Sequence, residues 1–229
     1  MAQATAAAPV SEAKINTFMA QVYLLMSVGL AVTGLVAYWA SNDTQFLVNL
    51  YTKPWFAFGL FIIQIILVVV LSARVMTMSP GAAALLFLLY AAVTGLALTS
   101  IFLIYSNEQI YSVFLLTSGV FLVTSLVGIV LKRDMSSAGN YIFMILLGWM
   151  LMWFLSWLFN FSTFNWALNF IGIAIFVALT AWDAQQIKKI GQQIGSHPAR
   201  GGLMVIGALK LYLDFINLFL LMLRASNRR

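Results

Sequence analysis

Long apolar runs separated by short polar breaks dominate the pattern of this chain. Seven runs of about 19–25 residues follow one another, and each is long enough for a helix to cross roughly 30 Å of hydrocarbon. A backbone in lipid must satisfy its own hydrogen bonds, and only a helix does so without closing a barrel. Each run therefore predicts a transmembrane helix: Thr17–Ala40, Trp55–Ala73, Gly81–Tyr105, Ile110–Leu131, Tyr141–Phe159, Trp166–Ile187 and Leu203–Leu223.

The breaks between the runs are too short to hold a soluble domain. We expect an all-α polytopic membrane protein, with a short cytoplasmic tail over 1–16, one seven-helix transmembrane domain over 17–224 and a basic C-terminal tail over 225–229. Short joins around Glu108 and around Asn160–Asn165 predict antiparallel hairpins. Ala91, Gly95 and Thr99 repeat at four-residue spacing, which predicts that a neighbouring helix approaches closely there.

Composition supports a membrane protein and excludes several kinds of active site. The 229 residues are 63% hydrophobic and 8% charged, and their mean hydropathy is +0.99. Cys is absent, which excludes disulfides, a thiol nucleophile and thiolate metal sites. The single His, His197, excludes a zinc site built on several His residues. We expect no enzyme activity and no cofactor.

Lys and Arg are distributed unevenly between the two sides of the predicted bundle. With the N-terminus in the cytoplasm, the outer loops carry only Lys53, while the basic residues Arg224, Arg228 and Arg229 follow the last run. The inner segments carry Lys14, Arg74, Lys132, Arg133, Lys188, Lys189 and Arg200. This bias predicts a cytoplasmic N-terminus and seven full crossings. The basic tail argues against an external C-terminus, and a last segment that enters the membrane and returns to the cytoplasmic side would satisfy it. The net charge of +6 is therefore mostly a topology signal and gives no reason to expect nucleic-acid binding.

Two of the six acidic residues, Asp183 and Asp214, lie inside the last two apolar runs. A carboxylate at membrane depth costs about 2.5–3.5 kcal/mol on insertion scales unless it is paired, hydrated or protonated. On the seventh predicted helix, Gly207, Lys210, Asp214 and Asn217 follow a spacing of three to four residues and form one polar stripe. We expect this stripe to face protein or water rather than lipid.

The two aspartates approach one another if the last helix begins late. At 1.5 Å per residue, Asp183 lies about 6 Å before the end of its apolar run. Asp214 lies ~16 Å into the last helix if that helix begins at Leu203, but only ~10 Å into it if the helix begins at Gly207. If the carboxyl groups meet, they share one proton and titrate as a unit. Protonation would close the pair, and deprotonation would separate it or attract a cation.

A structural interpretation of the same residues is simpler. Lys210 lies one turn before Asp214 and can pair with it, while Asp183 can pair with Lys188 or Lys189. In that case both aspartates would only stabilise the bundle.

Three segments of the chain resemble the Bax-inhibitor (TMBIM) family. Thr180–Gln185, which reads TAWDAQ, and Leu211–Phe219, which reads LYLDFINLF, are similar to the two signature segments of that family. Thr94–Phe102 is similar to a third defining segment. The resemblance covers about Phe18 to Leu223, and the short N-terminus suggests a bacterial member.

The resemblance implies a fold and a function. It implies seven helices with a central last helix, in the inner membrane of a bacterial cell, and a pH-sensitive leak for calcium or another cation. Asp183 and Asp214 would form the paired-aspartate sensor and weak calcium ligands, and Arg74 is the candidate for a basic latch. Lys210 departs from the family pattern, because a fixed positive charge beside Asp214 opposes binding of a divalent cation.

Other functions remain open. Some bacterial relatives resemble regulators that bind a membrane protease, and contacts of Glu12–Asn16 would then matter more than Asp183. An intramembrane aspartyl protease also has one Asp in each of two consecutive helices, but the Gly-x-Gly-Asp run of that class is missing because Gly207 lies seven residues before Asp214. A retinal protein needs a Lys in its last helix, but here Asp214 follows Lys210 instead of preceding it.

Overall fold

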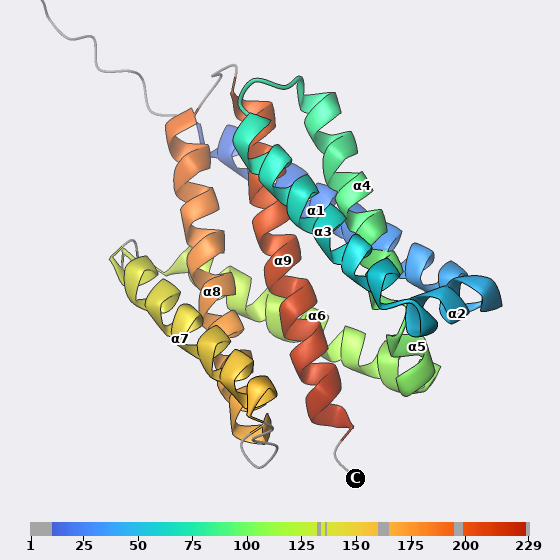
Figure 1. The fold of residues 1–229 in the computed structure, drawn as a ribbon. Coiled ribbons are helices and arrows are strands. Elements are labelled where there is room, and N and C mark those ends of the chain that lie inside the picture. Colours follow the sequence, from blue (N-terminus) through green and yellow to red (C-terminus); the bar gives the residue numbers. More distant parts are fainter. Residues whose placement is uncertain (1–10, 132–133, 136, 160–164, 195–198, 228–229) are drawn as a thin grey trace, which may run out of the picture.

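The computed structural model describes residues 11–131, 134–135, 137–159, 165–194 and 199–227. Within these residues the chain is helical and contains no strand. Figure 1 shows the helices as a bundle: α1 (Glu12–Ser41), α2 (Thr44–Thr52), α3 (Pro54–Arg74), α4 (Pro80–Leu98), α5 (Ile101–Ile104), α6 (Asn107–Val130), α7 (Ala138–Leu158), α8 (Asn165–Ile194) and α9 (Arg200–Ser226).

The seven predicted spans are confirmed. Seven helical stretches of the described chain are long and apolar enough to cross a membrane, with α4 and α5 together forming one of them. Several helix starts carry a recognisable signal. Pro54 and Pro80 occupy the first turns of α3 and α4, where proline is tolerated. The Ser79 and Ser106 hydroxyls accept hydrogen bonds from the amides of Ala82 and Gln109, and so cap α4 and α6.

Three features of the helices differ from the sequence prediction. Helix α8 continues to Ile194 instead of ending at Ile187, and α1 begins at Glu12 instead of Thr17. An apolar run shows only the part of a helix that crosses the membrane, so it does not show where the helix ends. The third run breaks between α4 and α5, where the Thr99 hydroxyl bonds back to the carbonyls of Gly95 and Leu96. Helix α2 was predicted as a loop, and the Asp43 carboxylate caps it by accepting from the Phe46 amide at 3.0 Å.

Helix α9 packs against α8, α1, α6 and α4, while α3 packs mainly on α4 and α7 on α8. Figure 1 shows α9 between α8 on one side and α1, α3 and α4 on the other. Of the seven spans, α9 has the largest buried share. The last helix therefore supplies much of the surface on which the other helices assemble.

Glycines allow two pairs of helices to touch backbone to backbone. A Cβ atom added at Gly95 of α4 would lie 2.6 Å from the carbonyl oxygen of Thr33 on α1. This contact confirms the close approach that the Ala91–Gly95–Thr99 spacing predicts. A Cβ atom at Gly128 of α6 would clash with the carbonyl oxygen of Ala181 on α8. Glycine at these positions permits close helix packing, as is usual in membranes.

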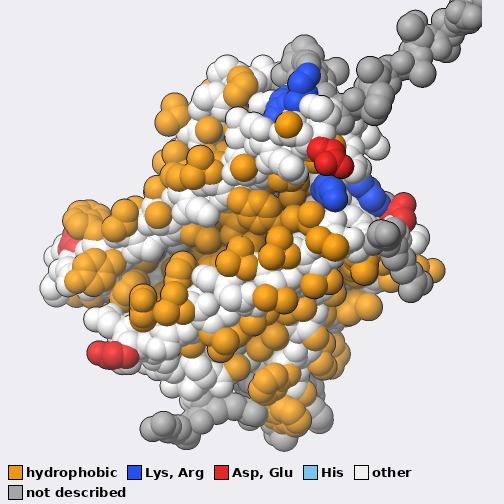
Figure 2. All heavy atoms as spheres, turned by 180° about the vertical axis from the view of Figure 1, so that it is seen from behind, with side chains coloured by type: hydrophobic (Ala, Val, Ile, Leu, Met, Phe, Trp, Pro, Cys, Tyr) orange, Lys and Arg blue, Asp and Glu red, His pale blue; other side chains and the backbone are white. Residues whose placement is uncertain are grey.

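The bundle has two ends of different charge. We call the end where α1 and α9 begin the N-terminal end, and the end where α9 finishes the C-terminal end. On the face in Figure 2, hydrophobic side chains cover the body and the visible Lys and Arg side chains gather at one end. At the N-terminal end the Arg200 guanidinium donates to the Lys14 carbonyl oxygen, which joins the starts of α9 and α1.

The contact at Gly128 leads to a stability prediction. Gly128→Ala should lower stability by about 1–3 kcal/mol, because its methyl group must push α6 away from the α8 backbone. Gly119 of the same helix has nothing within 4 Å of an added Cβ, so Gly119→Ala is the matched control. In a helix that change is intrinsically favourable, by about 1 kcal/mol. Unfolding midpoints in detergent measure the stability of each variant. A Gly128→Ala midpoint equal to that of Gly119→Ala would contradict the close packing of α6 against α8.

Candidate functional site

Asp183 and Lys210 lie at matching depths in the antiparallel helices α8 and α9. Asp183 lies 11 residues before the end of α8 (194 − 183), and Lys210 lies 10 residues after the start of α9 (210 − 200). At 1.5 Å per residue both are about 15–17 Å from the N-terminal end. The two helices pack directly against each other. The prediction that a late start at Gly207 brings the charges together is wrong, because the extra length of α8 does so instead.

The central contact of the site is an ion pair between the two helices. The Lys210 Nζ atom lies 3.0 Å from Asp183 Oδ1. The Asp183 side chain is only 9% exposed, whereas that of Lys210 is 41% exposed. The ammonium group also lies 5.3 Å from the ring centroid of Trp182, the residue before Asp183. A cation held by both a carboxylate and an aromatic face is well stabilised away from bulk water.

Asp214 completes the charge cluster from one turn further along α9. Its residue is 5% exposed, and its Oδ2 atom is buried without a hydrogen-bond partner. The charged groups that act on it electrostatically are Asp183 and Lys210. The structure therefore brings Asp183, Lys210 and Asp214 together, which we call the charge cluster.

A buried tyrosine fixes the rotation of α9 beside the charge cluster. Tyr212 is fully buried, and its hydroxyl oxygen lies 2.7 Å from Thr33 Oγ1 of α1. The Thr33 hydroxyl donates its only hydrogen to the Ala91 carbonyl at 2.9 Å, so Tyr212 is the donor to Thr33. Phe87 and Tyr90 pack edge-on against the Tyr212 ring. These contacts orient the α9 face that carries Lys210 and Asp214.

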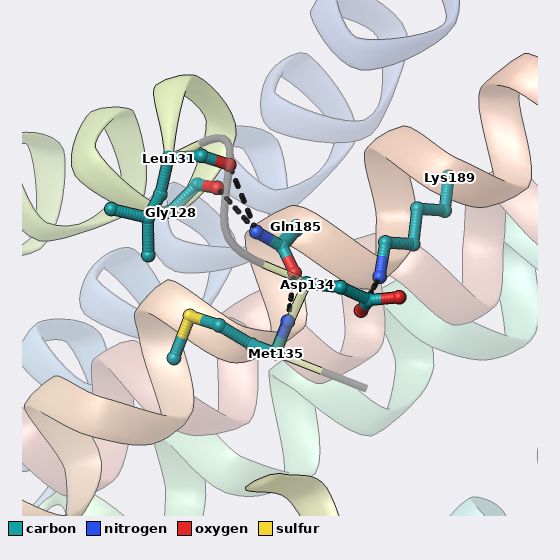
Figure 3. Close-up of polar contacts among 6 residues, drawn as sticks. All are labelled: Gly128, Leu131, Asp134, Met135, Gln185 and Lys189. Atoms are coloured by element: carbon teal, nitrogen blue, oxygen red, sulfur yellow. Dashed lines mark hydrogen bonds and ion pairs between the residues drawn. The ribbon is translucent and has the colours of Figure 1, made fainter. Parts of the chain in front are cut away.

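The turn of α8 after Asp183 holds the end of α6 and the chain that follows it (Figure 3). The Gln185 amide donates to the carbonyl oxygens of Gly128 (3.4 Å) and Leu131 (3.2 Å), and its Oε1 accepts from the Met135 amide at 2.8 Å. Lys189 forms an ion pair with Asp134. The last carbonyls of a helix have no partner within it, and here side chains from α8 supply those partners.

The structural interpretation of the sequence assigned these lysines differently. Lys210 pairs with Asp183 rather than with Asp214, because side chains on a helix lean toward its N-terminus and carry the ammonium away from a residue four positions later. Lys188 donates to the Ile129 carbonyl at 3.1 Å, and Lys189 reaches Asp134, so the prediction that either pairs with Asp183 is wrong.

Within the described residues, the other predicted site residues form no hydrogen bond or ion pair with the charge cluster. Arg74 is exposed at the end of α3 and forms no ion pair with any described residue. Gly207 is buried, and Asn217 is half-buried with its amide donating to the Leu213 carbonyl. His197, Lys132 and Arg133 and the join at 160–164 fall outside the described residues. No role was predicted for Gln185 or Asp134 from the sequence. The polar residues at 185, 188 and 189 have helical spacing, and this spacing was the signal that one face of α8 makes polar contacts.

Comparison with known proteins now decides the family. The profile of the family described as "Inhibitor of apoptosis-promoting Bax1" matches residues 15–229, which is nearly the whole chain. The chain belongs to the Bax-inhibitor family. Among its relatives is the inner membrane protein YbhL of Escherichia coli K12, which is 44% identical over 220 residues, or 95% of this chain and 94% of the relative.

More distant Bax-inhibitor relatives match over the same length. An uncharacterized protein of Borreliella burgdorferi is 35% identical over 93% of each chain. An uncharacterized membrane protein of Streptococcus pyogenes serotype M3 is 33% identical over 95% of each chain. Together with the seven apolar helices, the name of the YbhL relative supports a multi-pass protein of the inner membrane.

In this Bax-inhibitor protein the charge cluster alone offers fewer ligands than a calcium ion takes. Calcium takes six to eight oxygen ligands, and the two carboxyl groups offer at most four. No group of three or more His, Cys, Asp or Glu residues comes together in the described part of the chain. Lys210 already occupies one oxygen of Asp183. A divalent cation bound here would need backbone carbonyls and water to complete its coordination.

Proposed function

We propose that this Bax-inhibitor protein is a pH-sensitive leak for calcium or a similar cation in the inner membrane. Asp183 and Asp214 are its proton sensor and its weak cation ligands, and Lys210 is the built-in counter-ion. The observation that carries the proposal is the cluster itself, in which Lys210 bonds to Asp183 while an Asp214 oxygen is buried without a partner. The family resemblance points in the same direction.

Charge counting gives the cluster two states. With both carboxyl groups ionised, two negative charges and one positive charge leave a net charge of −1. One proton held between Asp183 and Asp214 makes the cluster neutral, which is the state that a low-dielectric interior favours. A divalent cation competes with that proton and with Lys210. Calcium binding should therefore release a proton and become stronger as the pH rises.

We infer a closed state on the C-terminal side of the charge cluster from an apolar cavity. A cavity of about 310 Å³ lies beyond it between α1, α5, α6 and α9, next to Phe215 and Phe219. Its lining is mostly apolar, and hydrophobic constrictions stop ions because water leaves them. Conduction would therefore need a rearrangement of these helices. No energy source is needed, since a negative cell interior favours divalent influx by roughly 4–5 kcal/mol per 100 mV.

The proposed orientation places the N-terminus and the N-terminal end of the bundle in the cytoplasm. Lys14, Arg74 and Arg200 lie at this end, whereas Lys53 lies at the other. The chain has no Cys, so single Cys residues can report the side directly. A Cys in place of Arg74 should react with an impermeant maleimide in inside-out vesicles and be protected in intact cells. A Cys in place of Lys53 should show the opposite pattern, and the reverse result for the two positions would overturn the orientation.

Calcium flux into proteoliposomes across a pH series tests the proposed leak. The parent should show a flux that depends on pH, and this dependence should disappear in Asp183→Asn and Asp214→Asn. Lys210→Met should raise apparent calcium affinity by about tenfold or more, since unit charges ~6 Å apart interact by roughly 2–3 kcal/mol at an effective dielectric near 20. Arg74→Gln in the same assay shows whether the proposed latch contributes.

Lys189→Met is the matched control for Lys210→Met, because it removes a lysine from an exposed ion pair at the same end of the bundle. It should leave calcium affinity unchanged. Parent-like flux in all of the Asp183, Asp214 and Lys210 variants would show that the charge cluster is structural. A role in binding a membrane protein, such as a membrane protease, would then be the better account of this chain.

A further inference from the structure

A second polar pocket lies at the C-terminal end of the bundle, away from the charge cluster. It has a volume of about 210 Å³ and forms where α7 and α9 end and α8 begins. Its lining includes Trp153, Asn165, Trp166, Asn169, Phe170 and Arg224. A water molecule occupies about 30 Å³ of liquid, so this space accommodates a group much larger than one water.

The pocket contains a cation without a carboxylate beside it. The Arg224 guanidinium carbon lies 5.0 Å from the ring centroid of Trp153. None of the pocket's lining residues is acidic. The aromatic face orients the guanidinium, and no described residue pairs its N–H donors with a negative charge. These donors suit an anion, above all a phosphate or carboxylate that accepts two parallel hydrogen bonds.

Two buried polar atoms of the same pocket lack partners. Asn169 is 7% exposed, and its Nδ2 donates to the Leu221 carbonyl at 2.9 Å. Its Oδ1 acceptor has no partner, and neither does the Nε1 donor of Trp153. Buried polar atoms without hydrogen bonds are costly. The pocket thus places the exposed donors of Arg224 beside two buried polar atoms, the Trp153 donor and the Asn169 acceptor, which a ligand reaches when the side chains that cover them move.

The depth of the pocket matches the polar boundary of a bilayer. Trp153 lies five residues before the end of α7 (158 − 153) and Arg224 two residues before the end of α9 (226 − 224). These offsets are about 8 Å and 3 Å along the helix axes. Trp and Arg side chains commonly anchor a protein at this level. Simple anchoring explains Trp166, but it does not explain the unpaired atoms of Trp153 and Asn169.

We infer that this pocket binds a phosphate ester whose substituent carries a hydrogen-bond donor, as in an ethanolamine or glycerol phospholipid headgroup. Arg224 and the Trp153 Nε1 group donate to phosphate oxygens. The Asn169 Oδ1 atom accepts from the ammonium or hydroxyl group of the substituent. A choline headgroup offers no such donor and leaves Asn169 unpaired, so the pocket discriminates against it. This inference does not depend on the proposed leak.

Native mass spectrometry of the detergent-solubilised full-length protein tests the site with defined lipids. Phosphatidylethanolamine and phosphatidylglycerol should be retained more strongly than phosphatidylcholine. Arg224→Gln should reduce retention roughly tenfold, which corresponds to the loss of a hydrogen bond to a charged group. Trp153→Phe should keep the aromatic face, remove only the Nε1 donor and give a smaller loss. Arg74→Gln, which removes an exposed arginine at the opposite end of the bundle, should have no effect.

Inorganic phosphate and glycerophosphoethanolamine distinguish a lipid from a soluble ligand. Weak displacement of the bound lipid by either compound at millimolar concentration would support the lipid headgroup. Strong displacement by inorganic phosphate, dependent on Arg224, would keep the phosphate site and assign it a soluble ligand. Equal lipid retention in Arg224→Gln, Arg74→Gln and the parent would overturn the inference. Equal unfolding midpoints of the variants in detergent ensure that a loss of retention is not a loss of fold.

Discussion

The need to neutralise charge inside a membrane constrains this structure more than any other requirement. A fixed charge in the hydrocarbon region is expensive unless it is paired. Here Asp183 on α8 meets Lys210 on α9 at 3.0 Å, and Asp214 lies against both. Because the two helices run in opposite directions, only one register puts Asp183 and Lys210 at the same depth. The ion pair therefore favours that register of α8 against α9, and α9 in turn contacts α1, α4 and α6.

The surrounding packing holds the charge cluster in place and connects it to the N-terminal end of the bundle. The Tyr212–Thr33 hydrogen bond orients α9, and the Gly128–Ala181 contact brings α6 close to α8. Gln185, two residues after Asp183, binds the last carbonyls of α6 and the Met135 amide. A change of charge at Asp183 thus acts on the same segment of α8 that holds the α6–α7 connection. Under the proposed function, this arrangement would connect protonation of Asp183 to that end of the bundle.

The sequence was sufficient to predict the spans, because each apolar run is long enough to cross the membrane and a helix is the simplest structure that can do so. It also predicted which charges deserve attention, since Asp183, Lys210 and Asp214 interrupt otherwise apolar helices. It failed at helix ends, because the polar residues after Ile187 read as a loop, whereas Lys188 and Lys189 of α8 bond to the Ile129 carbonyl and to Asp134. It also mispaired Lys210, because spacing along one helix cannot reveal which residue the neighbouring helix presents.

A double-mutant cycle between Asp183 and Lys210 tests most directly whether the cluster is one electrostatic unit. Unfolding free energies in detergent would be measured for Lys210→Met, Asp183→Asn and the double variant. Because Lys210 is partly exposed, we expect a coupling energy of about 1–3 kcal/mol, below that of a fully buried pair. The exposed Lys189–Asp134 pair is the control, with an expected coupling of about 0–1 kcal/mol. Additive effects at Asp183 and Lys210, no larger than those of the control, would contradict the central role of the ion pair.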